Sequence, residues 1–506
     1  MGLRRSSERA KSMSFDLIET TIGDVHAAYR AGTLTCRQLV EMYLERIDAH
    51  DKKGAAINAI ISVNSDALKE ADRLDAALKS SGPVGPLHGI PIIMKDQADA
   101  VGMPTTLGSV LFKDYYPDRD AFAVDKLKKA GAIILAKATL GELGGGDTHG
   151  SLFGSTRNPY NLERTAGGSS GGSGASVSAN FCTIAVGQEG FASIRRPSTW
   201  NCVAGMRPTA GLVSRSGVYA GWPSVNGSLG PMARTVADLA KLLDVMAGYD
   251  PEDPVTARGA GRMPVSFTQS LDQNGLKGKR IGILRQSMGY DAEPDSEDFD
   301  KVTEVFNKAV ADLKRAGAEI IDPVTIPDLN SLLARRAGSW SDDEESFTRW
   351  LNRSKNPPYR SRREAMENPE FQKIHKRARD RWQKTPTDQA HYEYLTAREQ
   401  LMTNFCKVIA DNQLDAIVHK SVEHQPTRIK DGVNPPFVDQ KGAPHVNTFL
   451  VYVPSIAVPA GFTRDGLPSG ITFLGRPYDD ANMIKLAYAY EQATRHRKPP
   501  PSVTPL

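Results

Sequence analysis

The chain has 506 residues, of which 40% are hydrophobic and 24% charged, and its net charge is +4. This is an ordinary globular composition, and the spread of its basic residues argues against a nucleic-acid-binding surface. No apolar run is long enough to span a membrane, and the basic residues 1–14 are not followed by an apolar signal segment. We therefore expect a cytoplasmic protein that binds neither nucleic acid nor membrane. Free thiols and no metal site are expected from the spacing of Cys36, Cys182, Cys202 and Cys406.

Helices and strands are predicted to alternate along the chain. Thr21 precedes a helix at 22–31 that ends at Gly32, and Thr35 and Gln38 form a capping box before the next helix. Further helices are predicted at 65–82, 123–131, 296–315 and 482–494. Apolar runs predict strands at 57–63, 89–95, 132–137, 181–186, 279–286, 415–420, 453–462 and 471–477. The alternation predicts an α/β fold.

Residues 330–412 differ in character from the rest of the chain. They are highly charged, with scattered aromatic residues. Two interpretations stay open: a solvated helical layer, or a partly mobile cover over a pocket. No linker divides the chain, so we expect one domain at 16–495 that contains this insert. A disordered segment at 1–15 is expected before it, and an extended proline-rich tail at 496–506 after it.

The stretch at 165–197 begins as a Gly/Ser run, TAGGSSGGSGA, which on its own could be a flexible linker. A buried strand follows at once, however, and linkers do not usually lie between core elements. Ser169, Ser170 and Ser193 lie in its glycine-rich turns, and Lys95 ends an earlier apolar strand. Small residues before Ser193 allow backbone N–H groups to point into one cavity, as stabilisation of an oxyanion requires. We interpret the stretch as a catalytic site.

A serine nucleophile needs a base. No histidine lies between His149 and His375, whereas a lysine can act as a base when desolvation lowers its pKa. The apolar residues before Lys95 suit this role, although a lysine at a strand end can also simply reach solvent.

Five motifs together resemble the amidase signature family. They are GIPIIMKD at 89–96, GGSSGGSGA at 167–175, GQEGFASIRRP at 187–197, GMRPTAGLVSRSGV at 205–218 and GSLGPMARTVADLA at 227–240. The resemblance implies the amidase signature fold, a mixed central β-sheet covered by α-helices on both faces. It also implies a hydrolase that cleaves a carboxamide to an acid and ammonia or an amine, without a cofactor, and with esterase activity as a side reaction. The protein would act on a small-molecule amide as a monomer or homodimer.

The same resemblance assigns roles to residues. Lys95 would be the neutral base, Ser169 a proton relay after a cis peptide bond from Gly168, and Ser193 the nucleophile that carries the acyl group. Ser170 would support the Lys95–Ser169 network. The implied oxyanion hole and substrate-binding groups are Gly190, Phe191, Ala192, Ser193, Gly144 and Gly145.

Several positions depart from the commonest family pattern. Ala166 replaces a proline, Glu189 replaces an aspartate, and Phe191 and Ala192 replace two glycines. Each keeps a backbone N–H, so these changes bear on the shape of the pocket more than on the reaction. The triple glycine at 144–146 is interpreted as room in the acyl-side pocket, as a backbone-lined wall, or as a flexible turn.

Parts of the sequence also fit other functions, to different degrees. GSSGG at 168–172 fits the nucleophile elbow of α/β-hydrolases, which would use His419, His424 or His445, but the preceding segment is polar and contains proline, unlike the strand that the elbow requires. A phosphate-binding loop lacks its lysine, because none occurs between Lys137 and Lys241. An amidotransferase component that passes ammonia to a partner, and a catalytically silent binding protein, remain as alternatives.

Overall fold

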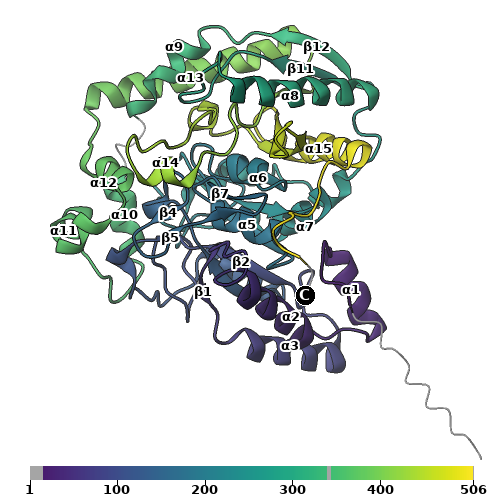
Figure 1. The fold of residues 1–506 in the computed structure, drawn as a ribbon, viewed down its shortest axis with the longest axis vertical. Helices are drawn as coiled ribbons and strands as arrows, with labels where there is room; N and C mark the ends of the chain where they lie inside the picture. Colours follow the sequence, from purple (N-terminus) through teal and green to yellow (C-terminus); the bar gives the residue numbers. More distant parts are fainter. Residues whose placement is uncertain (1–14, 339–342, 505–506) are drawn as a thin grey trace, which may run out of the picture.

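The computed structural model describes residues 15–338 and 343–504, and the segment expected to be disordered lies almost wholly outside them. Its centre is a mixed sheet flanked by helices (Figure 1). In the described part of the chain this sheet has eleven strands, in the order β1 (Ile60–Val63), β3 (Ile133–Ala138), β2 (Pro91–Lys95), β8 (Ile184–Glu189), β10 (Ser228–Ala233), β9 (Ala204–Arg207), β14 (Ser455–Phe462), β15 (Pro468–Leu474), β13 (Ala416–Lys420), β11 (Arg280–Leu284) and β12 (Glu319–Val324).

Strand β2 lies parallel to both of its neighbours, β3 and β8. In the β2–β8 register Ile92 pairs with Ile184 and Met94 with Val186. The carboxyl ends of parallel strands meet at one edge of a sheet, so the end of β2 at Lys95 and the turn after β8 lie next to each other. All residues of β2 and β8 are buried, as in sheets covered on both faces.

The predicted helix starts are confirmed. Thr21 and Asp24 form a capping box at α1, and Thr35 and Gln38 form one at α2. Gly32 ends α1 in the left-handed conformation that glycine adopts easily. The main helices around the sheet are α1 (Ile22–Ala31), α2 (Cys36–His50), α3 (Ala67–Ser81), α4 (Phe122–Lys129), α5 (Gly171–Ser178), α6 (Arg195–Trp200), α7 (Val236–Met246), α8 (Glu297–Arg315) and α15 (Asp480–Thr494).

Some strands were missed by the sequence analysis. No strand was predicted at β9, β10 or β12. The polar, proline-containing segment before the Gly/Ser run contains strand β7 (Asn161–Thr165). This strand pairs with β6 (Arg157–Asn158) in a separate two-stranded sheet, so it does not supply the central-sheet strand of a nucleophile elbow.

The charged segment at 330–412 forms helices with buried faces. They are α9 (Leu329–Leu333), α10 (Asp343–Leu351), α11 (Arg362–Glu367), α12 (Lys376–Gln383) and α13 (Asp388–Asp411). Phe347, Trp350 and Trp382 pack with Phe112 and Leu107 of the sheet-bearing part in one apolar cluster. Within the described residues, no helix is both long and apolar enough to cross a membrane.

Candidate active site

The structure brings Lys95, Ser169 and Ser193 into one hydrogen-bonded row. Lys95 Nζ lies 2.7 Å from Ser169 Oγ, which lies 2.9 Å from Ser193 Oγ. Lys95 and Ser169 are fully buried, whereas 8% of Ser193 is exposed. Only the outer end of the row is therefore accessible to a substrate.

Backbone elements hold this row in place. Lys95 ends β2, and Ser169 follows a cis peptide bond from Gly168, as the resemblance implied. The next residue, Ser170, lies at the N-terminus of α5, and its hydroxyl donates to the Gln188 carbonyl at 3.1 Å. Lys95 Nζ also donates to that carbonyl, at 3.3 Å. Ser170 thus shares an acceptor with Lys95, and both are tied to the end of β8.

Burial lowers the pKa of Lys95 well below the usual value for lysine. The carboxylate of Glu189 acts in the opposite direction, and the positive charge of Arg381 adds to the lowering. Lys95 is therefore disposed to be neutral at physiological pH, which a proton-accepting role requires.

Glu189 organises the turn that ends at Ser193. Its carboxylate accepts hydrogen bonds from the backbone N–H groups of Ile194 and Arg195 at 2.8 and 2.9 Å, and pairs with the Arg195 Nε at 2.9 Å. Burial alone would raise the pKa of Glu189, but Arg195 and these hydrogen bonds hold it below the usual range. The Glu189 side chain, which is longer than the aspartate of the commonest family pattern, thus binds both the N-terminus of α6 and the buried Arg195 side chain.

The predicted oxyanion-hole segment follows β8 directly. In the described part of the chain, the backbone N–H groups of Gly190, Phe191, Ala192 and Ser193 donate to no protein atom. Buried N–H groups are rarely left without a partner, so a turn with several such groups beside a reactive hydroxyl is suited to bind a ligand oxygen.

The Phe191 side chain has a defined place. Its ring is 6% exposed and meets His445 edge-on, with 4.9 Å between ring centroids. The Arg336 guanidinium lies 3.9 Å from the centroid of the same ring. His445 in turn stacks on Tyr290 at 5.7 Å. Burial and nearby arginines lower the pKa of His445 to about 3. The Phe191 ring is therefore held by its neighbours and leaves the nucleophile accessible.

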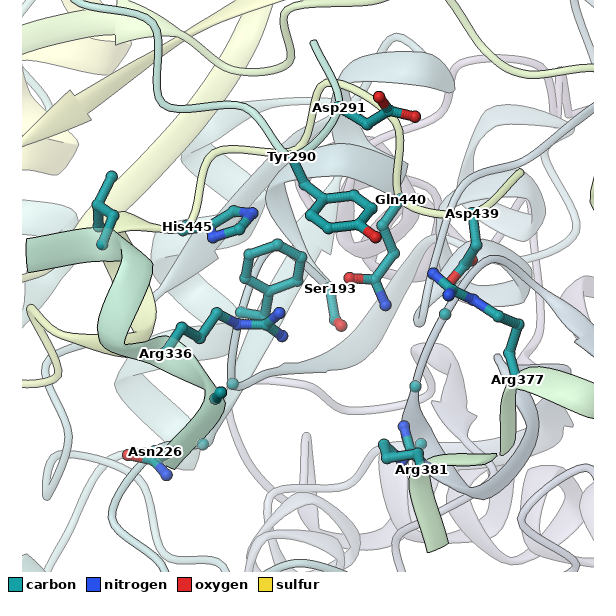
Figure 2. Close-up of a pocket in the computed structure, with 18 of the residues that line it drawn as sticks. Ser193, Asn226, Tyr290, Asp291, Arg336, Arg377, Arg381, Asp439, Gln440 and His445 are labelled. Atoms are coloured by element: carbon teal, nitrogen blue, oxygen red, sulfur yellow. The ribbon is translucent and has the colours of Figure 1, made fainter. Parts of the chain in front are cut away.

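A cavity of about 910 Å³ opens above Ser193 (Figure 2). Gly190, Phe191 and Ser193 line its floor, and the sheet-bearing part also contributes Gln97, Tyr219, Gln440 and His445. Residues of the 330–412 segment line it on two sides, Arg336 next to Phe191 and Arg377 and Arg381 across from it. Figure 2 shows Arg336 and Arg381 on different sides of the cavity, carried by different elements.

The triple glycine at 144–146 forms a backbone wall of this cavity against which three side chains pack. A Cβ atom on Gly144 would contact the Tyr219 ring at 3.3 Å, and one on Gly146 would lie 3.1 Å from the Asp439 carboxylate. A Cβ atom on Gly145 would overlap the Arg381 guanidinium, at 1.4 Å from Nη1. Of the three interpretations of this loop, the backbone-lined wall describes the structure.

Comparison with known proteins identifies the family. Residues 38–484 match the protein family described as Amidase. The chain belongs to the amidase family, the amidase signature enzymes. It is 32% identical to a probable amidase of Arabidopsis thaliana over 99% of this chain and 95% of that protein. It is 31% identical to a glutamyl-tRNA(Gln) amidotransferase subunit of Methanosarcina barkeri, over 93% of this chain and 96% of that protein.

The structural comparison agrees. The native peptide amidase from Stenotrophomonas maltophilia matches with a TM-score of 0.86 at 33% identity, over 96% of this chain and 99% of that chain. The predicted family and the predicted mixed α/β fold are both confirmed.

Several residues of this amidase site were missed by the sequence analysis. Arg336, Arg381 and Asp439 line the cavity although they lie far from the signature motifs, and Tyr219 lines it directly after the motif at 205–218. Asp439 is buried and accepts the Asp147 N–H at 2.6 Å as well as the Arg377 guanidinium at 3.1 Å. The charge of the 330–412 segment was visible in the sequence, but nothing local indicated which of its many arginines face the cavity. In the described residues, no group of three His, Cys, Asp or Glu side chains is placed to hold a metal ion.

Proposed function

We propose that the chain hydrolyses a carboxamide through Lys95, Ser169 and Ser193, with an acyl-enzyme on Ser193. The observation that carries this proposal is the row of short contacts from Lys95 Nζ through Ser169 Oγ to Ser193 Oγ, which leaves only the nucleophile accessible. A serine hydroxyl can donate and accept at the same time, so one serine can pass a proton between two neighbours.

In the first half-reaction, Ser193 Oγ attacks the carbonyl carbon of the amide. Its proton passes to Ser169, and the Ser169 proton passes to neutral Lys95. The carbonyl oxygen becomes an oxyanion that the backbone N–H groups of residues 190–193 stabilise; one such donor contributes on the order of 3 kcal/mol in enzymes. Ser169 then protonates the leaving nitrogen and regains a proton from Lys95. The C–N bond breaks, and ammonia or an amine departs.

In the second half-reaction, water replaces the amine. The same relay removes a proton from the water as it attacks the acyl carbon, and a second tetrahedral oxyanion forms in the same turn. Its collapse breaks the bond to Ser193 Oγ, returns the proton to Ser193 and releases the acid. An ester can form the same acyl-enzyme, so esterase activity is expected as a side reaction.

For the substrate, the similarity to a peptide amidase favours a small-molecule or peptide carboxamide. A cavity of about 910 Å³ lies at the upper end of the usual range for ligand pockets and accommodates such a molecule. The similarity to an amidotransferase component keeps a second candidate, a glutaminase that delivers ammonia to a partner. Amide hydrolysis by the isolated chain supports the first function, and glutaminase activity that requires a copurifying partner supports the second.

The test is intact-mass analysis after reaction with phenylmethanesulfonyl fluoride, followed by a panel of amides and esters. One adduct that maps to Ser193 is expected in the wild type, and none in Ser193→Ala, whose turnover should fall by about 10⁶-fold. Ser176→Ala is the matched control, because Ser176 is a buried serine on α5 away from the row. Retained turnover in Ser193→Ala would contradict the assignment of the nucleophile.

A further inference from the structure

Arg196 lies on helix α6, three residues after Ser193, and takes no part in the proton relay itself. Its side chain is 1% exposed and does not line the cavity. Nη2 of its guanidinium donates to the Gly168 carbonyl at 2.9 Å. Among the described residues no other group donates to this buried carbonyl, which belongs to the peptide bond that leads into Ser169. Arg196 therefore connects the helix that follows Ser193 to the backbone of Ser169.

The charge of Arg196 is matched inside the core. Its Nη2 also lies 3.0 Å from Asp147 Oδ1, and both side chains are buried. Asp147 is held in turn, because its N–H donates to the Asp439 carboxylate at 2.6 Å and its Oδ2 accepts from the Thr427 hydroxyl at 3.2 Å. The Arg196 guanidinium also lies 5.6 Å from the centroid of the Trp200 ring. Buried ion pairs often add little net stability, so the defined position of this guanidinium is the more informative property of the pair.

Ser169 is held at both of its peptide bonds. Its own carbonyl accepts the Gly141 N–H at 3.0 Å, and the carbonyl before it is held by Arg196. Peptide bonds are planar, so a fixed carbonyl oxygen on each side leaves the Ser169 Cα little freedom. The Ser169 hydroxyl needs this restraint, because it must stay within hydrogen-bonding distance of Lys95 Nζ and Ser193 Oγ at once, at 2.7 and 2.9 Å. A rotation of the peptide unit before Ser169 would lengthen at least one of these two contacts.

We infer that Arg196 is a positioning residue for Ser169: it holds the preceding carbonyl from the helix that follows Ser193, and so keeps the relay hydroxyl between the base and the nucleophile. This inference rests on the proposed relay. Without Arg196 the buried Gly168 carbonyl would lose its donor, and its peptide unit would turn toward another one. A displacement of about 1 Å at a reacting group can lower a rate by about 100-fold.

The test uses the double variant Arg196→Met/Asp147→Asn, which removes both charges and so leaves no carboxylate in the core without its partner. Circular dichroism and thermal unfolding verify that it folds. Its kcat on the best amide of the panel and its rate of inactivation by phenylmethanesulfonyl fluoride should both fall by about 10–100-fold, because Ser169 is displaced. KM should stay within about twofold of the wild-type value, because neither residue lines the cavity. A loss of stability alone would not separate kcat from KM in this way.

Two single variants serve as controls. Asp147→Asn keeps the Arg196 bond to the Gly168 carbonyl and should lower kcat by no more than about threefold. Arg46→Met removes a similarly buried arginine of α2, which donates to the Ala179 carbonyl at 2.9 Å beyond the C-terminal end of α5, and it should keep the wild-type kcat and labelling rate. Wild-type kcat in the double variant, a change confined to KM, or an equal loss in either control would overturn the inference. Absence of labelling in the wild type would instead overturn the proposed function.

Discussion

The floor and the far wall of the cavity are built in different ways. The floor is formed by the Ser193 turn at the end of β8, with Lys95 at the end of β2 and Ser169 before α5 buried beneath it. Short hydrogen bonds join these three side chains. The far wall, formed by α12, carries half-exposed arginines and is held by an aromatic cluster and a few polar contacts at its edges. The floor is built into the buried core, whereas the position of the wall depends on docking of a charged helical segment.

This difference separates two properties of the site. Chemistry at Ser193 depends on groups whose positions the central sheet determines, so it should tolerate changes in the wall. The shape and electrostatic potential of the cavity depend on the wall, so they should change when its docking is weakened. A variant that alters only the wall therefore shows whether the chemistry at Ser193 also changes, and a variant that alters only the floor shows whether the cavity keeps its shape.

The largest effect is expected for Lys95→Met. Methionine fills a similar volume without a basic group, so the relay loses its proton acceptor and kcat should fall by about 10⁴-fold or more. The fold should persist, because the change removes a buried amine from an apolar environment. Steady-state kinetics on the best amide of the panel and circular dichroism provide the measurements. A loss of activity smaller than tenfold would show that another residue serves as the base.

Phe112→Ala should weaken docking of the wall and leave the arrangement of Lys95, Ser169 and Ser193 unchanged. Phe112 is 1% exposed and meets the rings of Phe347, Tyr359 and Trp382 of the charged segment. Truncation of a buried phenylalanine typically costs about 3–5 kcal/mol. Thermal unfolding should show this loss, and kcat/KM should fall while Ser193 still reacts with phenylmethanesulfonyl fluoride at high pH.

Tyr116→Ala is the matched control for Phe112→Ala. Tyr116 lies four residues after Phe112 and is 60% exposed, so its truncation should change stability by less than about 0.5 kcal/mol. If Phe112→Ala abolishes labelling of Ser193 at every pH, the floor and the wall form one cooperative unit and the distinction between them is wrong.

The floor was more accessible to sequence analysis than the wall, for physical reasons. Lys95, Ser169 and Ser193 lie in contiguous motifs whose glycines and small residues are required by local backbone geometry. Strand β10 was missed because it contains glycine and proline, yet Gly230 is needed there, since a Cβ would lie 1.9 Å from the Met206 carbonyl.

The wall was not predicted because its contacts join residues that are far apart in the sequence. Arg381 and Gly145 are 236 positions apart, and their contact depends on how an aromatic cluster docks a distant segment. The sequence indicates that residues 330–412 are charged and helical, but charged helix faces are usually solvated. Only tertiary packing selects which of these arginines enters the cavity.

Gly145→Ala tests the contact between loop and wall. The new Cβ would overlap the end of the Arg381 side chain, which can move away because it is flexible. We expect kcat/KM to fall by about tenfold, equivalent to about 1.4 kcal/mol, as Arg381 leaves its place against the loop. In an Arg381→Ala background the same change should cost almost nothing, because the overlap is gone. Equal losses in both backgrounds would show that Gly145 matters for a different reason.

The smallest effect concerns the pH dependence of docking. Asp99 lies four residues after Lys95, and its carboxylate accepts the Trp350 Nε1–H of the charged segment at 3.2 Å. Burial raises the pKa of Asp99 to about 7, although the charge of Lys137 acts against this. Between about pH 4 and 7 the folded protein therefore keeps a proton on Asp99 that the unfolded chain has lost, so this group's contribution to stability decreases as pH rises through that range.

Asp99→Asn should remove this slope, because asparagine never ionises and its Oδ1 still accepts the Trp350 hydrogen bond. Relative to the wild type, the variant should gain about 1 kcal/mol in unfolding free energy as the pH rises from 6 to 7. Denaturant titrations that follow tryptophan fluorescence at several pH values measure the difference. Asp118→Asn is the control, since it neutralises an exposed carboxylate that accepts the Lys355 N–H at 2.8 Å from the same segment. A slope that persists unchanged in Asp99→Asn would show that a group other than Asp99 causes the pH dependence of stability.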